Sequence, residues 1–491
     1  MSIAMLKGWL MLLLLAPGAV QAAGALGFDA ARHFLNRTSF AASVDDINSF
    51  AALTREQAAD RLLAWAGTRV NTPAPDWANH FESRRRVRGM SEEERKAFQR
   101  EQFEKGVELR AWWLAEMLTT PSPLTEKMTL FWHNHFVSSL RKVKSPALMY
   151  RQNLLLRRHA LGYFGDLLHE VSKDPAMVVY LDSASNRKGQ PNENFAREVM
   201  ELFTLGEGNY GEQDIKEAAR AFTGWGIDPE RGEFVFRRQA HDEAEKTVLG
   251  RSGNFDGDAV LDILLAQPQT AEFIVAKLWR EFVSPTPEPA EVRRIARMFR
   301  DHRYDIKVAL RALLVSDAFY APQNRAALIK SPIDLIVGTL RQFRFETGEV
   351  TPFLFVSRQL GQDLFAPPNV KGWPGGEAWI NSATLLARKQ LLERMFRAQE
   401  MARPVLMSMN RADGERVKGI VKPGGDGRER FMRAMMDLRF DADRWLSQFR
   451  PGDPLLLKTV LPADTASVPV AVAQGIGVLR QLVLDPVYQL K

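Results

Sequence analysis

The chain has 491 residues, of which 45% are hydrophobic and 25% charged, so it has the composition of a globular protein with a large core. Lysine and arginine exceed aspartate and glutamate by only 66 to 59, and no basic block is interleaved with aromatics, so nucleic-acid binding is not indicated. The chain has no cysteine, which excludes disulfides, thiol nucleophiles, thiolate metal sites and c-type haem attachment.

Residues 1–22 have the pattern of a secretory signal peptide. Lys7 supplies the positive charge, Leu10 to Ala16 form a short apolar core, and Val20-Gln21-Ala22 places small residues at the recognition positions. The apolar run is too short to span a membrane, and no later stretch approaches about eighteen apolar residues. We expect cleavage after Ala22 and an exported protein, periplasmic or secreted, without a transmembrane segment in the mature chain. An uncleaved N-terminal anchor is the alternative.

Apolar residues at helical spacing recur through most of the remaining chain and predict an all-α protein. The predicted helices include Ala30 to Leu35, Asp45 to Trp65, Phe103 to Met117, Thr125 to Leu140, Leu154 to Val171, Glu193 to Leu205, Gln213 to Trp225, Asp258 to Leu265, Thr270 to Val283, Glu288 to His302, Ile306 to Val315, Pro332 to Phe343, Thr384 to Met401, Arg428 to Phe449 and Val478 to Leu484. Arg84 to Arg100 is dense in charge and indicates a solvated helix face.

Strand signals are almost absent. Phe234 and Phe236 alternate with charged residues and predict at most a short β-hairpin near 232–239. The polar segment His241 to Gly250 is predicted to be a loop. The sequence thus predicts a large single-domain array of many helices joined by long ordered loops.

The expected domain organisation follows from the same reading. Residues 23–402 lack a long flexible linker and are predicted to form the main helical domain. Residues 403–425 are basic and rich in glycine, the weakest candidate for order. Residues 426–491 are predicted to form a C-terminal helical segment that packs on the main domain.

The stretch Gln190 to Gly208, which reads QPNENFAREVMELFTLGEG, is the strongest candidate for chemistry. On a helix, Asn194, Glu198 and Glu201 fall at i, i+4 and i+7 and share one stripe, beside a parallel apolar stripe. Two carboxylates in a cleft would have their pKa values split by burial and by each other's charge, as acid–base catalysis requires. The alternative is a solvated face with ordinary i,i+4 ion pairs.

FWHNHF, Phe131 to Phe136, contains two histidines. On a helix, His133 and His135 point about 200° apart, with His135 on the side of Phe131 and Trp132. On a strand they would share a face and could bind one metal ion. We predict a helix, so these histidines are only weak candidates for metal ligands.

Several stretches together resemble the domain-of-unknown-function 1800 family of exported bacterial proteins. They are HFLNRTSF from His33, FWHNHF, the run from Asp174 to Tyr210, DIKEAARAFTGW from Asp214, HDEAEKTVLG from His241, and PPNVKGWPGGEAWINSATLLAR from Pro367. The resemblance implies export and a neighbouring gene for a protein similar to the alkaline phosphatase superfamily. It implies no particular reaction and no established catalytic residue.

These motif segments are rich in side chains that are costly to bury unpaired, and they fall in loops and at helix ends, where sites are commonly built. The catalytic candidates are Glu198, Glu201, His241 and Asp242. The binding candidates are Asn192, Asn194, Arg220, Lys246, Trp373, Trp379 and Asn381. If these residues converge, with Glu217 and the tryptophans as stacking platforms, they would form a polar cleft.

Such a cleft would suit hydrolase-type acid–base chemistry on a sugar-containing or other envelope substrate. The alternative is a non-catalytic helical protein that binds or assembles with a partner enzyme. The partners expected are the alkaline-phosphatase-like neighbour and polyanionic envelope material. No Walker loop, Gly-x-Gly-x-x-Gly, Gly-x-Ser-x-Gly or His-Glu-x-x-His motif is present, so nucleotide cofactors and ordinary serine hydrolysis are not indicated. A metal ion is a less favoured cofactor.

Overall fold

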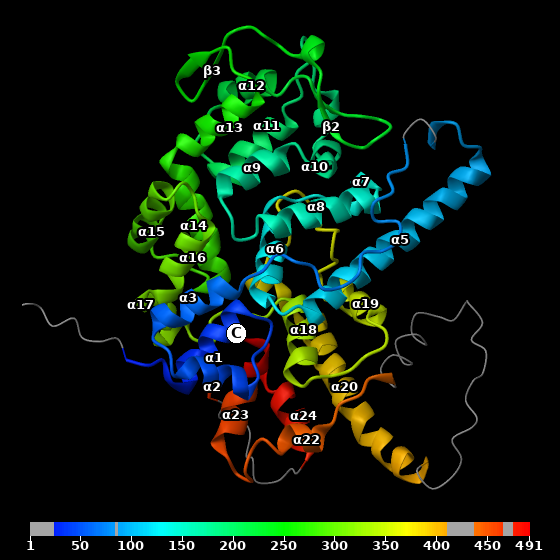
Figure 1. Cartoon of the computed structure of the whole chain (residues 1–491), viewed down its shortest axis with the longest axis vertical. Helices are drawn as coiled ribbons and strands as arrows, with labels where there is room; N and C mark the ends of the chain where they lie inside the picture. Colours follow the sequence, from blue (N-terminus) through cyan, green and yellow to red (C-terminus); the bar gives the residue numbers. More distant parts are fainter. Residues whose placement is uncertain (1–23, 84–86, 410–436, 465–474) are drawn as a thin grey trace, which may run out of the picture.

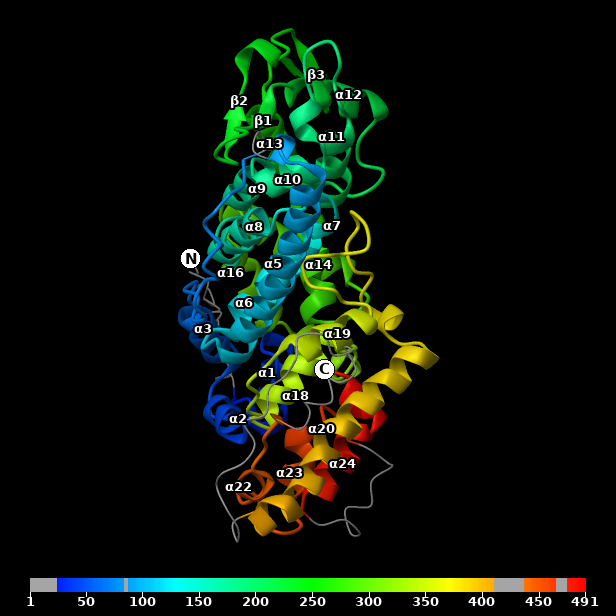
Figure 2. The same cartoon turned by 90° about the vertical axis from the view of Figure 1, so that its right-hand side faces the viewer.

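A computed structural model describes residues 24–83, 87–409, 437–464 and 475–491. The expected signal segment and most of the 403–425 segment therefore lie outside the described residues. The elements run along one elongated body, from the β-hairpins and α12 at one end to α22 and α24 at the other (Figures 1 and 2).

The all-α prediction is confirmed. The helices are α1 Gly27–Thr38, α2 Val44–Ala51, α3 Arg55–Trp65, α5 Glu92–Thr119, α6 Pro123–His135, α7 Leu140–Val143, α8 Pro146–Arg158, α9 Phe164–Ser172, α10 Pro175–Tyr180, α11 Asn194–Glu198, α12 Glu212–Ala221, α13 Gly257–Ala266, α14 Pro268–Phe282, α15 Pro289–Asp301, α16 Ile306–Val315, α17 Asp317–Tyr320, α18 Pro332–Gln342, α19 Thr351–Gln359, α20 Ser382–Met409, α22 Ala442–Leu446, α23 Pro454–Val460 and α24 Ile476–Leu484.

Two of the predicted helices are broken into shorter ones, the first of them by a local cap. Thr54 accepts a hydrogen bond from the N–H of Gln57 and starts α3 afresh after α2. The predicted helix Leu154 to Val171 is also two helices, because α8 ends at Arg158 and α9 begins at Phe164. Tyr163 between them forms an extended bridge with Asp305, which the amphipathic pattern alone does not reveal.

Two small antiparallel hairpins are present in the described chain. β1 (Trp225–Ile227) pairs with β2 (Phe234–Phe236), so the hairpin predicted near 232–239 contains β2 but has its other strand earlier in the chain. β3 (Lys246–Val248) pairs with β4 (Arg251–Gly253), in part of a segment that was predicted to be a loop. Leu249 and Gly250 both have positive φ, which matches the tight two-residue turn favoured in hairpins. Leucine is unusual at such a position, so this turn could not be predicted from its residues.

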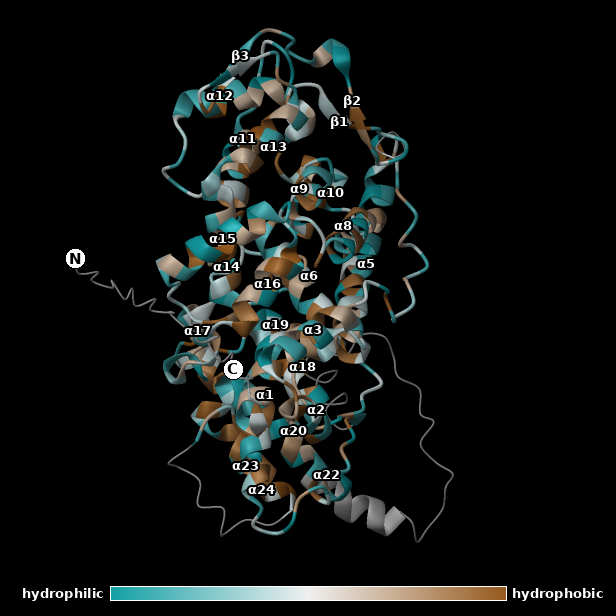
Figure 3. Cartoon of the chain, turned by 60° about the vertical axis from the view of Figure 1, so that its left-hand side comes forward, coloured by the Kyte–Doolittle hydropathy of each residue, from teal (hydrophilic) through white to brown (hydrophobic). Residues whose placement is uncertain are grey.

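Buried apolar side chains form two clusters that meet along α6 and α8. The first is built mainly from α1 to α3, α9 and α11 to α17. The second is built from α5, α18 to α20 and α22 to α24. Apolar and polar residues alternate along the helices, as amphipathic packing requires (Figure 3). Within the described ranges, no single helix is long and apolar enough to cross a membrane, although α13 and α14 together pass that test with a bend of 74°.

Buried ion pairs lie where α6 joins the two clusters. Glu126 receives two hydrogen bonds from Arg157, at 2.7 and 2.9 Å, and one from the indole of Trp113. The next residue, Lys127, donates to Asp334 on α18 at 2.8 Å. Lys491 donates to the other oxygen of Asp334 at 2.6 Å. Neighbouring side chains of α6 thus bind partners on different helices, Glu126 on α5 and α8 and Lys127 on α18.

Candidate functional site

Glu198 and Glu201 lie where an α-helix changes into a π-helix. The α-helical hydrogen bonds of α11 end at Glu198, and residues Val199–Thr204 form a π-helical turn that ends before Gly206, whose φ is +79°. A π-helical turn inserts an extra residue into the helix, and such turns are frequent at functional sites. The predicted helix is therefore present, but its predicted i, i+4, i+7 geometry does not extend past Glu198.

Two basic side chains, His135 and Lys277, bind carbonyl groups of this π-helical turn. His135 makes a hydrogen bond from Nε2 to the carbonyl oxygen of Phe203 at 3.1 Å. Lys277 on α14 donates to the carbonyl oxygen of Leu202 at 3.2 Å and to Nδ1 of His135 at 2.9 Å. Burial and the charge of Lys277 hold the pKa of His135 well below its usual value, so its ring is neutral. His135 thus stabilises the turn that carries Glu201.

The two carboxylates influence each other and are only partly accessible. Burial raises the pKa of Glu198, and the negative charge of Glu201 raises it further, against the opposing effects of Arg197 and Lys371. The hydroxyl of Tyr210 donates a hydrogen bond to Glu201 at 2.6 Å. Glu198 therefore keeps its proton to a higher pH than an ordinary glutamate.

The loop from Phe365 to Asn381 brings Lys371 to this pair. Asn134, between the two histidines of α6, accepts a hydrogen bond from the N–H of Trp373 at 2.7 Å. Gly372 has a φ of +85°, and a Cβ there would lie 2.3 Å from the Asn134 side-chain oxygen. Lys371 then reaches Glu207 at 3.0 Å, and its pKa is raised by Glu207 and also by the two site glutamates. We call Glu198, Glu201, Tyr210 and Lys371 the carboxylate site.

The histidines of α6 diverge, as predicted. His133 is buried among Trp113, Phe365 and Trp373, and burial lowers its pKa to about 3. His135 lies beside Phe131 and Trp132. In the part of the chain that the structure describes, no three histidine, aspartate or glutamate side chains are grouped closely enough to hold a metal ion.

Arg220, His241, Asp242 and Lys246 form a separate group around the β3–β4 hairpin. Arg220 donates to Asp242 at 2.8 Å and to Glu217 at 2.7 Å, and the first contact lowers the pKa of Asp242 to about 2. Lys246 is buried and donates to the carbonyl oxygens of Asp242 and Ala244. The expected convergence of this group with Glu198 is therefore not observed, because the cations that act on Glu198 are Arg197 and Lys371.

The side chains of His241, Asn192 and Asn381 serve local structure. His241 is buried, and its Nδ1 lies 2.9 Å from the Thr223 carbonyl oxygen. Asn192 accepts from the exposed Asn194 at 3.0 Å and shapes the entry to α11. Asn381 accepts from the N–H of Thr384 at 2.9 Å and caps the start of α20.

Trp373 and Trp379 are both buried, at 4% and 6% exposure, so neither offers an open face for stacking a ligand. The expectation of a single polar cleft with stacking platforms is not met in this arrangement. Sequence reasoning missed Lys371, which belongs to the carboxylate site. It also missed Asn134 and Lys277, which hold the segments that form this site. The one available signal was that Asn134 and Lys371 lie inside the two motifs richest in aromatics and polar residues.

A cavity of about 950 Å³ lies elsewhere, between α5, α7, α8 and α19. None of the predicted site residues lines it. A second cavity of about 810 Å³ lies before α11 and is lined by Asn192, Arg187 and Arg237, among others.

Comparison with known proteins identifies the family. The sequence model described as "Protein of unknown function (DUF1800)" matches residues 33–468, most of the chain. The chain therefore belongs to this family. No curated protein and no solved structure matches it.

Proposed function

We propose that this member of the DUF1800 family is an exported enzyme that uses the carboxylate site for hydrolase-type acid–base chemistry on a sugar-containing envelope substrate. The observation that carries the proposal is the raised pKa of the half-buried Glu198, which lies one helical turn from a second carboxylate, Glu201. Two carboxylates whose environments differ in this way are the usual arrangement for glycoside hydrolysis. Export is inferred from the signal-peptide pattern of residues 1–22. Mass spectrometry of the mature protein should then find an N-terminus at or near Ala23.

The roles of the two glutamates follow from their surroundings. Glu198, which holds its proton longer, protonates the leaving oxygen as the glycosidic C–O bond breaks. Glu201 accepts a proton from the attacking water, whose oxygen forms the new bond to carbon. Tyr210 fixes the carboxylate of Glu201 through its 2.6 Å hydrogen bond. Lys371 offsets part of the negative charge of the pair.

The test is a comparison of Glu198→Gln with the unchanged protein on purified peptidoglycan sacculi, with release of new reducing ends as the readout. Glu198→Gln keeps the shape and removes the proton donor, so release should fall by about 10²–10⁴-fold. Glu217→Gln is the matched control, because Glu217 pairs with Arg220 in the separate hairpin group.

The pH profile gives a second readout. The raised pKa of Glu198 should place the alkaline loss of activity above the range of an ordinary glutamate, since activity ends when Glu198 loses its proton. If the unchanged protein released no ends, or if Glu198→Gln were as active as the unchanged protein, the proposal would be wrong.

A non-catalytic scaffold that works with an alkaline-phosphatase-like enzyme, or that binds polyanionic envelope material, is the second candidate function. The buried ion pairs of Glu126 and Lys127 favour it, because such pairs can specify one rigid arrangement of helices. Full retention of physiological function by Glu198→Gln in cells would support this candidate over catalysis.

A further inference from the structure

The 950 Å³ cavity is formed where the N-terminal half of α5 leaves the body of the protein (Figure 1). Its walls come from this half of α5, from α7 and the start of α8, from α19, and from the chain around Trp77 and Phe81. A cavity of this size is at the upper end of the range for small-molecule sites.

Apolar side chains dominate the lining of this cavity. Phe98 and Phe103 enter from α5, Leu354 and Phe355 from α19, and Trp77 from the preceding chain. Phe103 is 70% exposed and Phe355 is 46% exposed, so two of the few large apolar side chains that the described residues leave open to solvent meet at this one place. Exposed apolar surface that gathers in one hollow indicates a binding site.

The charged residues around the cavity are mostly basic. The lining contains Arg88, Arg95, Lys105, Arg110, Arg141, Lys144 and Arg358, but only two acids, Glu82 and Asp363. Arg110 donates to Asp363 at 2.8 Å, and Lys105 pairs with Glu101 at 2.5 Å. Lys144 and Arg358 are exposed and have no carboxylate partner among the described residues.

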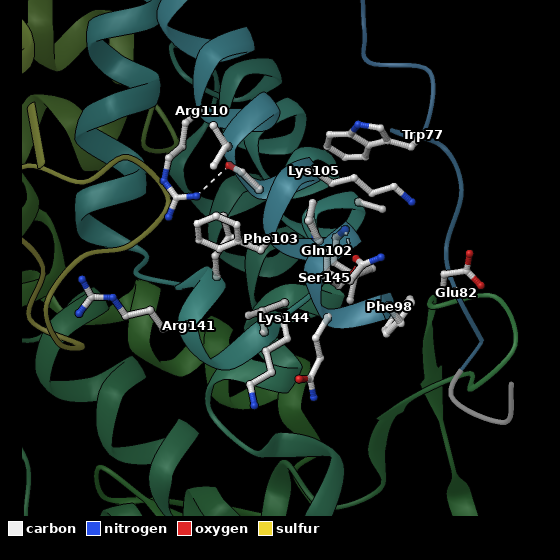
Figure 4. Close-up of a pocket in the computed structure, with 18 of the residues that line it drawn as sticks. Trp77, Glu82, Phe98, Gln102, Phe103, Lys105, Arg110, Arg141, Lys144 and Ser145 are labelled. Atoms are coloured by element: carbon white, nitrogen blue, oxygen red, sulfur yellow. Dashed lines mark hydrogen bonds between the residues drawn. The ribbon is translucent and has the colours of Figure 1, made fainter. Parts of the chain in front are cut away.

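Two of the basic groups lie away from the acid at the rim. In the close-up, Arg141 and Lys144 lie away from Glu82, with their charged ends pointing in different directions, whereas Lys105 lies toward Trp77 (Figure 4). We call Arg141 and Lys144 the basic side of the cavity. Arg141 is only loosely held, with its guanidinium 3.9 Å from Asp363 and 63% of its side chain exposed. An anionic group on this basic side would gain a cation at little cost in existing contacts.

We propose that this cavity binds a single-chain amphiphile that carries an anionic head, with its hydrocarbon chain along the aromatic wall and its head on the basic side formed by Arg141 and Lys144. Burial of each methylene is the main source of affinity, and charge complementarity selects the head. This site is distinct from the carboxylate site, since no residue of that site lines the cavity.

The test is calorimetric titration of the mature, full-length protein with monomeric oleoyl lysophosphatidate, below its micelle-forming concentration. Oleoyl lysophosphatidylcholine, with the same chain and a zwitterionic head, tests the role of the basic side. Oleate tests whether any anionic head suffices. We expect the two anions to bind more tightly than the zwitterion.

Two variants distinguish the contribution of the aromatic wall from that of the basic side chains that bind the head. Phe355→Ser should weaken all three ligands by about tenfold, which corresponds to about 1.4 kcal/mol. The double change Arg141→Glu with Lys144→Glu should weaken the two anions by at least this factor and leave the zwitterion nearly unchanged. Phe236→Ser on β2, where the side chain is 47% exposed, and Lys307→Glu on α16 are matched controls away from the cavity.

Several results would overturn the proposal. They are absence of binding, equal affinity for anionic and zwitterionic lysolipids, and binding that neither variant weakens. Binding to phosphatidylglycerol vesicles without binding to the monomers would also overturn it, because it would indicate a membrane surface as the ligand. Glu198→Gln should bind lysophosphatidate as the unchanged protein does, so failure of the catalytic proposal would leave this one standing.

Discussion

The change Asp334→Asn tests the ionic junction between the two apolar clusters. Asp334 is buried and accepts hydrogen bonds from Lys127 at 2.8 Å and from Lys491 at 2.6 Å. The amide of asparagine has nearly the same shape and can still accept from the N–H of Ser331, so the helix cap of α18 is kept. What is lost is the negative charge that faces two buried ammonium groups.

The expected cost follows from this geometry. Removing one partner of a buried ion pair typically costs about 3–5 kcal/mol, because the other charge stays buried without compensation. The unfolding entropy of a chain of this length is about 1 kcal/mol/K, so the melting temperature should fall by about 3–5 °C. Asp317→Asn is the control, since Asp317 is fully exposed and its ion pair with Arg55 should contribute little.

The pH dependence of the defect gives an internal check. Burial lowers the pKa of Lys127, and the negative charge of Asp334 is the largest effect that opposes this lowering. Without it, Lys127 loses its proton more easily in the folded state than in the unfolded state, so the stability of the variant rises with pH. The deficit, measured by circular dichroism during heating, should therefore shrink between about pH 7 and pH 10. A deficit like that of the Asp317 control, or one that grows with pH, would refute the reasoning.

Two further predictions concern Asp174 and Gly372. Burial raises the pKa of Asp174 to about 7, so the folded protein holds a proton there that the unfolded chain releases, and stability falls as pH rises from about 4 to 7. Asp174→Asn keeps a good helix cap and should match the unchanged protein near pH 5 but melt at a higher temperature near pH 8; an equal difference at both pH values would contradict this. Gly372→Ala should lower the free energy of unfolding by about 1–3 kcal/mol more than Gly375→Ala, because both have positive φ but only the first Cβ meets Asn134. Equal losses in urea titrations would show that Asn134 does not hold the loop.

Much of the helical framework could be predicted because amphipathic spacing and caps are local properties. α15 is an example: a buried stripe of Val292, Ile295 and Phe299 recurs at helical spacing behind a proline start. The divergence of His133 and His135 followed from helix geometry in the same way. Even the short β1–β2 pairing left a signal in the alternation of Phe234 and Phe236.

Only the two glutamates of the candidate site could be predicted from the sequence, and not their surroundings. Glu198 and Glu201 could be chosen from their stripe, but the π-helical turn depends on Lys277 and His135, which lie far away in the sequence and bind its carbonyl groups. Arg220 looked like a partner for Glu198, yet it pairs with Asp242, because a third segment folds back as a hairpin that has no turn signal. The cavity beside α5 could not be foreseen, since its walls come from segments between Trp77 and Asp363.

The ion pair between α6 and α18 affects the order in which parts of the chain can fold. Lys127 and Asp334 are separated by 207 positions, so α6 cannot neutralise its buried ammonium group until a much later segment has arrived. A chain threaded through an export channel from its N-terminus would present α6 early and α18 late. Contacts between such distant residues slow folding, because a long loop must close before they form. The first helices to emerge would therefore stay partly folded until a holdase bound them or the rest of the polypeptide arrived.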